Sequence, residues 1–159
     1  MNMTIQRASE RGGADHGWLN AKHYFSFANY HNPEKVHFGM LRVLNDDIIA
    51  GGTGFPTHPH DNMEIVTIPF TGALQHKDST GGAGIIKAGD VQIMSAGSGV
   101  RHSEANASQT EAVNLFQLWV FPKKRNIEPR YDQKTYDIKD RINKWQIVVS
   151  PNEADKALW

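Results

Sequence analysis

Four residues in two short stretches could together hold a metal ion. His58 and His60 stand two positions apart, as do His102 and Glu104. In an extended chain, residues i and i+2 point to the same side, so each pair would present both side chains to one point. On neighbouring strands, the pairs would supply three imidazole nitrogens and one carboxylate, which suit Fe(II), Mn, Co, Ni, Cu or Zn. A single His-x-His unit is usually only a surface feature, but two such units favour a metal site.

A second carboxylate competes for the fourth ligand position. Glu64 follows His60 by four residues, so period-2 alternation would place it on the same face as His58 and His60. It could bind the metal, or it could accept a hydrogen bond from an imidazole and so orient that ring. The residue spacing leaves both roles open.

The other histidines carry weaker expectations. His23 could line the mouth of a pocket, although a packed or surface position is the simpler interpretation. His16 is expected to be structural. Three more are expected at the surface: His31, His37 and His76.

Composition excludes several function classes. The 159 residues include 17 Lys and Arg against 17 Asp and Glu, so the formal net charge is zero, which argues against direct nucleic-acid binding and against a polybasic membrane-surface protein. There is no cysteine, which excludes disulfides, thiolate metal sites and a cysteine nucleophile. No apolar stretch is long enough to span a membrane, and no secretory signal is visible, so a cytoplasmic location is the default expectation.

Short apolar runs separated by glycine, proline and polar turns predict an all-β sandwich or barrel. Residues 45–47 are interpreted as a turn. Residues 1–122 are predicted to form the barrel, residues 123–144 a polar linker, and residues 145–159 the start of a second, truncated unit. The predicted strands are residues 38–44, 63–68, 73–78, 84–87, 91–94, 113–121 and 145–149.

Two segments resemble the motifs of the cupin superfamily. Residues 52–64, with Gly52 followed by His58, His60 and Glu64, look like the first cupin motif, and residues 89–106 look like the second. More specifically, the chain resembles the pirin family and its bacterial quercetinase-like members. The matching stretches are residues 15–19, 25–28, 41–47, 54–60, 63–67, 89–97 and 99–104.

The resemblance implies a bicupin, in which two jelly-roll-like β-barrels pack face to face and the N-terminal barrel holds the metal. Its ligands would be His58, His60, His102 and Glu104, with Glu64 outside the ligand set. Iron is the metal expected first. The chain would cover the N-terminal barrel and only the beginning of the second. The face left exposed between barrels would be apolar and could pair two copies of the chain.

The resemblance also implies a reaction, namely 2,3-dioxygenase cleavage of a quercetin-type flavonol with release of carbon monoxide. The flavonol 3-hydroxyl would bind the metal, which lowers its pKa, and Glu104 would accept the proton. The alternative is a non-enzymatic, redox- or metal-dependent regulatory protein that binds a transcription factor or a metabolic enzyme. A third interpretation is a cupin that holds a metal for stability alone.

Overall fold

The chain folds almost entirely into β-strands. The computed structural model describes residue 3 and residues 5–158. The predicted domain limits at residues 1 and 159 therefore lie outside the described residues. The strands are β1 (Gly12–Asp15), β2 (Leu19–His23), β3 (Leu41–Ile49), β4 (Gly54–His60), β5 (Glu64–Thr71), β6 (Ala73–Asp78), β7 (Ala83–Lys87), β8 (Asp90–Ser95), β9 (Val100–Asn106), β10 (Val113–Val120) and β11 (Arg130–Thr135). Three short 3-10 helices complete the order: η1 (Ala8–Glu10), η2 (Ile138–Arg141) and η3 (Glu153–Asp155).

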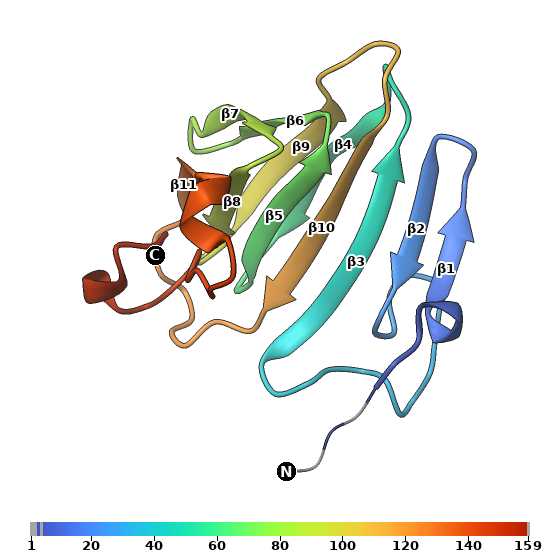
Figure 1. Ribbon diagram of the computed structural model, residues 1–159, viewed down its shortest axis with the longest axis horizontal. Helices are drawn as coiled ribbons and strands as arrows, with labels where there is room; N and C mark the ends of the chain where they lie inside the picture. The colour runs from blue at the N-terminus through green and yellow to red at the C-terminus, as the bar shows by residue number, and fades with distance from the viewer. Residues whose placement is uncertain (1–2, 4, 159) are drawn as a thin grey trace.

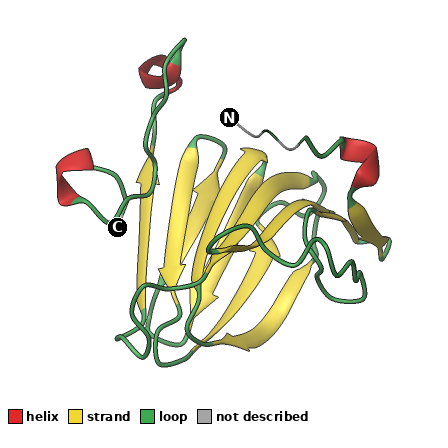
Figure 2. Cartoon of the chain, turned by 90° about the horizontal axis from the view of Figure 1, so that it is seen from below, coloured by secondary structure: helices red, strands yellow, loops and turns green. Residues whose placement is uncertain are grey.

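The strands form two sheets that face each other. The larger sheet has the order β1-β2-β3-β10-β5-β8-β11 and the smaller one the order β4-β9-β6-β7. In Figure 1 the smaller sheet lies behind β5 and β10, and in Figure 2 the helical segments lie outside the strands. None of the helices in the described part of the chain has the length and apolarity needed to cross a membrane. The predicted all-β, two-layer architecture is confirmed.

Alternate residues of the two sheets fill the space between them. At one end, Leu115 of β10 packs with Leu74 and Ile86 of the smaller sheet. At the other end, Met94 of β8 packs with Val100 of β9. Between these two apolar clusters, β9 and β10 both carry polar residues that point inward. The barrel therefore encloses a polar centre with an apolar cluster on each side.

The turn predicted at residues 45–47 is wrong, because β3 runs straight through it to Ile49. Asn45 and Asp47 are buried and lie between Val43 and Ile49 on the inner face of the strand. Asn45 has a partner there, since its Oδ1 lies 3.0 Å from Nδ1 of His23. Asparagine and aspartate usually mark a turn, but in β3 they line the polar centre of the barrel.

A β-bulge in β4 sets the direction of its histidines. Phe55 is opposite Glu104 and His58 is opposite His102, so three steps along β4 match two along β9. Without the extra residue, His58 would point to the other face of the sheet. A bulge re-aims side chains in this way, and it tolerates Pro56, which cannot donate a ladder hydrogen bond.

The C-terminal part of the chain packs on the outer face of the larger sheet. β11 lies within the predicted linker and pairs with β8. The strand predicted at residues 145–149 is wrong, because only an isolated bridge joins Val149 to Leu158 there. This segment is held instead by Tyr136, whose hydroxyl donates to the Val148 carbonyl at 2.6 Å and accepts from the Leu158 amide at 3.2 Å. The division into domains stays a prediction.

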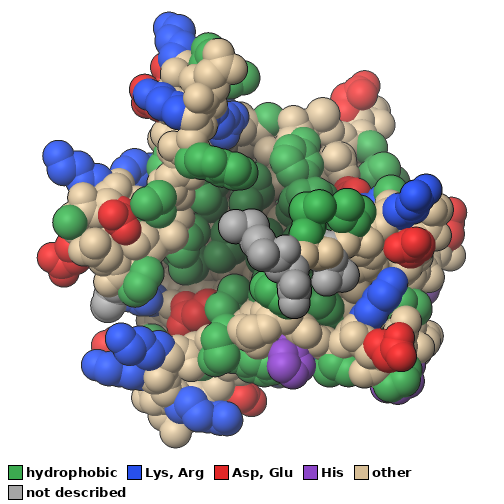
Figure 3. Space-filling model, turned by 60° about the horizontal axis from the view of Figure 1, so that its bottom comes forward, with side chains coloured by type: hydrophobic (Ala, Val, Ile, Leu, Met, Phe, Trp, Pro, Cys, Tyr) green, Lys and Arg blue, Asp and Glu red, His purple; other side chains and the backbone are tan. Residues whose placement is uncertain are grey.

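Part of the outer face of the larger sheet is exposed and apolar. Phe70 and Phe116 meet edge to face with ring centroids 4.6 Å apart, and Phe70 and Ile48 are each nearly half exposed. Figure 3 shows hydrophobic side chains gathered in a hollow of the surface. An exposed apolar face was expected, and association of two copies through it stays a prediction.

Gly54 offers a test of how closely β4 and β9 must approach. A Cβ at Gly54 would lie 2.3 Å from the carbonyl oxygen of Glu104 and 2.4 Å from Cα of Ala105. We expect Gly54→Ala to lower the free energy of unfolding by roughly 1–3 kcal/mol and to weaken metal binding, because it separates the two strands. Gly39→Asn is the control, since Gly39 has a φ of 55° and open space around it. Urea unfolding with wild-type stability for Gly54→Ala would contradict the close approach.

Candidate metal centre

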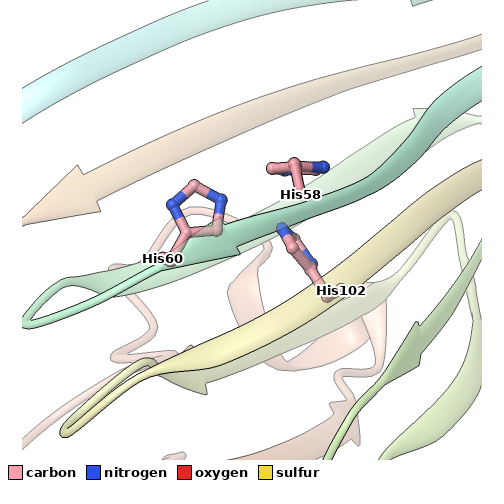
Figure 4. Close-up of side chains that lie close together, drawn as sticks. All are labelled: His58, His60 and His102. Atoms are coloured by element: carbon pink, nitrogen blue, oxygen red, sulfur yellow. The ribbon is translucent and has the colours of Figure 1, made fainter.

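Three histidines from two neighbouring strands meet inside the barrel. His58 and His60 come from β4 and His102 from β9, and one nitrogen of each lies within 4.8 Å of the others. Their ring centroids are 4.4 Å apart for His58 and His102, 4.8 Å for His60 and His102, and 4.9 Å for His58 and His60. Figure 4 shows the three rings converging above the two strands. The sequence prediction of three convergent imidazoles corresponds to this group.

Hydrogen bonds to the outer nitrogens orient two of these rings. Nδ1 of His58 lies 2.8 Å from the Pro56 carbonyl oxygen, and Nδ1 of His102 lies 3.4 Å from Nδ1 of His76. The other nitrogen of His102, Nε2, is buried without a hydrogen-bond partner in the described part of the chain. A buried polar atom without a partner is costly, so this nitrogen needs a ligand. The donor set therefore fits a divalent transition metal.

The environment keeps two of the imidazoles neutral. Burial, helped by neighbouring His58, lowers the pKa of His60 to about 4. Burial, helped by the other histidines, lowers the pKa of His102 to about 3. Only a neutral imidazole has a lone pair to give, so both rings are ready to bind a metal at neutral pH.

Glu104 lies beside this group but belongs to a second one. It forms a fully buried set with His76 and His102, again with ligand atoms within 4.8 Å of one another. Burial raises the pKa of Glu104, and the hydrogen bond from Gln117 opposes that rise. Glu104 lies beside His102 and is buried away from bulk solvent, so it is still a candidate ligand. Its role stays a prediction.

Gln117 holds the Glu104 carboxyl from the opposite sheet. Its Nε2 donates to Oε1 and Oε2 of Glu104 at 3.1 and 2.9 Å. Its Oε1 accepts from the indole N–H of Trp119 at 3.0 Å. Because an indole nitrogen can only donate, this bond fixes which end of the Gln117 amide faces Glu104. Trp119 therefore holds the N–H end of the Gln117 amide toward Glu104, and the Glu104 carboxyl accepts hydrogen bonds from it.

Glu64 does not join the histidines, and the parity argument that placed it there is wrong. Asn62, with a φ of 46°, turns the chain between β4 and β5. The two strands belong to different sheets, so alternation does not carry over from His60 to Glu64. The carboxylate accepts a hydrogen bond from the Ser95 hydroxyl instead. Asn62 was the available signal, since Asn is the residue other than Gly that most readily adopts this backbone conformation.

The remaining histidines divide into buried and exposed. His76 was predicted at the surface and is instead fully buried, because β6 pairs with β9 and turns this ring inward. His23 is packed rather than open to a pocket, with its ring centroid 5.3 Å from that of Phe27. The others are exposed: His16, His31 and His37.

Sequence reasoning missed two polar residues of this centre, Gln117 and Asp47. Both lie on strands of the larger sheet that face the histidines. Burial, with the nearby charge of Glu104, raises the pKa of Asp47 to about 7, and its Oδ1 has no hydrogen-bond partner among the residues described. Gln117 is a single polar residue among apolar ones, a signal that the sequence offered. Asp47 ends the polar run of residues 45–47, which the turn interpretation took out of the strand.

A cavity of about 480 Å³ opens beside the metal centre. His60 and Trp119 are among its lining residues, and their rings meet edge to face at 4.8 Å. Met63, Val100 and Arg101 also line it. The volume lies in the range of small-molecule sites, and the cavity gives an organic ligand access to one edge of the three-histidine group.

Comparisons with known proteins agree with these features. Residues 4–120 match the family model described as Pirin. The Escherichia coli (strain K12) protein named Quercetin 2,3-dioxygenase is 48% identical over 154 residues, which cover 97% of this chain and 65% of the relative. The crystal structure of YhhW from Escherichia coli aligns with a TM-score of 0.91 at 49% identity, over 96% of this chain and 64% of that chain.

A second solved structure contains a metal. The bacterial pirin YhhW from Escherichia coli in complex with nickel(II) aligns with a TM-score of 0.80 at 45% identity. The alignment covers 89% of this chain and 65% of that chain. This chain thus spans about 65% of the length of its curated relative.

Removing any one of the three histidines should abolish tight metal binding. Loss of a residue that hydrogen-bonds to a metal ligand typically costs about 10–100-fold in metal affinity. Loss of a ligand itself should cost more, so we expect His58→Ala, His60→Ala and His102→Ala each to weaken Ni²⁺ binding by more than about 100-fold. Calorimetric titration of the metal-free protein measures this. His31→Ala, which removes an exposed histidine, should bind as the wild type does. Equal affinities for all four variants would contradict the site.

Asp47 should make the stability of the metal-free protein depend on pH. Its raised pKa means that the folded state holds a proton that the unfolded chain loses above pH 3.8, so this residue costs stability as pH rises from about 4 to 7. Asp47→Asn should remove that cost and raise the free energy of unfolding at pH 8 but not at pH 4. At about 1.4 kcal/mol per pKa unit, the gain has an upper limit of about 4 kcal/mol.

Denaturant unfolding at a series of pH values tests this expectation. Burial also shifts the pKa values of His60 and His102, but these residues are present in both proteins and their contribution cancels in the difference. Glu104 interacts with Asp47, so the difference includes that interaction. Asp140→Asn, which changes an exposed carboxylate, is the matched control and should show no such gain. A pH-independent effect of Asp47→Asn would show that burial does not perturb this group.

Proposed function

The chain belongs to the pirin family, and on that premise we propose that it is a metal-dependent dioxygenase that cleaves quercetin-type flavonols at the 2,3-bond. The observation that carries the proposal is the group of three convergent imidazoles beside a cavity of small-molecule size. The relative named Quercetin 2,3-dioxygenase supports the choice of reaction. Its activity belongs to a protein of which this chain spans about 65%.

A divalent metal agrees with the donor set and with the nickel(II) complex of the related pirin. We propose Fe(II) as the working metal, because imidazole and carboxylate donors with open positions are typical of non-haem iron oxygenases. Mn, Co, Ni, Cu and Zn remain chemically compatible with these donors. His58, His60 and His102 would hold the ion, with Glu104 as the fourth ligand or as a base beside it.

The cavity would accept the flavonol as a flat aromatic ligand. Trp119 offers an aromatic ring to this cavity, and Met63 and Val100 offer apolar contacts. When bound, the metal supplies the positive charge that lowers the pKa of the flavonol 3-hydroxyl. Dioxygen would be the second substrate, entering through the same cavity.

Glu104 would receive the proton of the 3-hydroxyl. Burial raises its pKa, which brings a carboxylate closer to the strength that a general base needs near neutral pH. Gln117 donates to both carboxyl oxygens and so keeps the group oriented while it is charged. Trp119 fixes the Gln117 amide, so hydrogen bonds through Gln117 connect the wall of the cavity to the base.

Oxygen uptake with quercetin tests the proposal. The Fe(II)-loaded wild-type chain should consume oxygen in proportion to quercetin and release carbon monoxide. Glu104→Gln should lower kcat by roughly 10²–10⁴-fold if it removes the base, and metal analysis of the same sample separates this from loss of the ion. His31→Ala should retain full activity, and His58→Ala should have none.

Stoichiometric iron without oxygen uptake would contradict the dioxygenase. That outcome would favour the non-enzymatic alternative, in which the metal controls binding to a protein partner.

A further inference from the structure

We propose that His76 and Asp78 form a buried positioning pair that fixes the tautomer of His102 and aims its Nε2 at the metal. The inference rests on the metal centre of the proposed function and adds to it a pair of residues outside the ligand set. Both come from β6, which pairs with β9 on the side opposite to β4. His76 lies across from Glu104 and Asp78 across from His102 in that pairing.

The contacts form a continuous chain that ends at the centre. Oδ2 of Asp78 lies 3.1 Å from Nε2 of His76. Nδ1 of His76 lies 3.4 Å from Nδ1 of His102. The side chains of His76 and Asp78 are 0% and 1% exposed, so water does not compete for these bonds. Beyond them, Nε2 of His102 is the buried nitrogen that lacks a partner in the described structure.

With the His76 ring neutral, hydrogen-bond chemistry allows one arrangement of protons along this chain. A carboxylate can only accept, so Nε2 of His76 must carry a hydrogen and donate it to Asp78. In a neutral ring, Nδ1 of His76 is then an acceptor, and Nδ1 of His102 must donate to it. This leaves Nε2 of His102 without a hydrogen and with its lone pair free. The anion at one end thus determines the nitrogen that is available to the metal at the other end.

Asp78 is itself held in place as an acceptor. Its Oδ1 accepts from the amide of Thr80 at 2.8 Å, from the hydroxyl of Thr80 at 2.7 Å and from the amide of Gly82 at 2.9 Å. A Cβ at Gly82 would lie 2.1 Å from Oδ2 of Asp78, so the turn requires glycine to close over the carboxylate. The turn between β6 and β7 therefore serves to anchor this group.

The ring of His76 is fixed from a third direction. Tyr131 of β11 stacks on it with centroids 4.7 Å apart and an angle of 25° between the planes. The Tyr131 hydroxyl donates to Gln133 at 2.9 Å. A Cβ at Gly84 would lie 2.4 Å from that hydroxyl, so a second glycine makes room for the ring. Strand β11, which was predicted to be linker, thus supports the metal centre through His76.

A second interpretation assigns His76 to a metal ligand, in a group with His102 and Glu104. The contacts favour the positioning role, because both nitrogens of His76 already have partners in Asp78 and His102. The two interpretations differ in stoichiometry. Positioning implies one metal per chain, and ligation by His76 would allow a second ion.

Variants of His76 test the proposal by metal affinity in the absence of any substrate. His76→Leu removes both hydrogen bonds and should weaken Ni²⁺ binding by about 10–100-fold, the usual effect of losing an outer partner of a ligand. His76→Gln should restore most of the affinity, because its carbonyl oxygen can accept from His102 and its amide can donate to Asp78. The titration should give one Ni²⁺ per chain. Wild-type affinity for His76→Leu, or two ions per wild-type chain, would overturn the proposal.

The tautomer of His102 is measured directly in the metal-free wild-type protein by two-bond ¹H–¹⁵N NMR. The resonances of His102 should show a hydrogen on Nδ1 and none on Nε2. A hydrogen on Nε2 would overturn the proposal even if His76→Leu failed to fold. Neither measurement involves quercetin or oxygen, so the failure of the dioxygenase proposal would leave this result standing, and the reverse also holds.

Discussion

The backbone pairing of β9 with β4 on one side and β6 on the other is the constraint on which the site depends. It brings His58 beside His102 and His76 beside Glu104, so four groups from three strands share one inner face. The bulge in β4 is part of the same pairing, because it turns His58 toward the interior. Any change that slides β9 by one residue would turn its inward side chains to the other face and disperse the group.

Burying so many polar groups in one barrel is costly unless they have partners, and several groups of this centre do have them. Gln117 reaches Glu104 from the opposite sheet, and Asp78 reaches His76 from two residues further along the same face of β6. The apolar clusters at both ends keep water from competing for these bonds. Nε2 of His102 is a nitrogen that this network leaves to a ligand.

The same burial acts on acids and bases in opposite directions. It lowers the pKa of His60 and His102 and raises that of Asp47 and Glu104, so burial disfavours the charged form of each group. A divalent cation would reverse this preference for the carboxyls and satisfy the imidazole lone pairs.

The sequence by itself determined the local features. Residues two apart in extended chain share a face, so the pairs His58 with His60 and His102 with Glu104 were predictable, as were most strands and the all-β fold. That the two pairs lie close together was only an expectation, because it requires a register between strands. The tertiary structure alone decided three further points. The turn at Asn62 sends Glu64 into the other sheet, the interior polarity keeps Asn45 and Asp47 inside β3, and the pairing of β6 with β9 buries His76. Alternation along a strand is set by neighbouring residues, whereas the sheet that a strand joins, and the groups that face it there, are set by contacts between residues far apart in the chain.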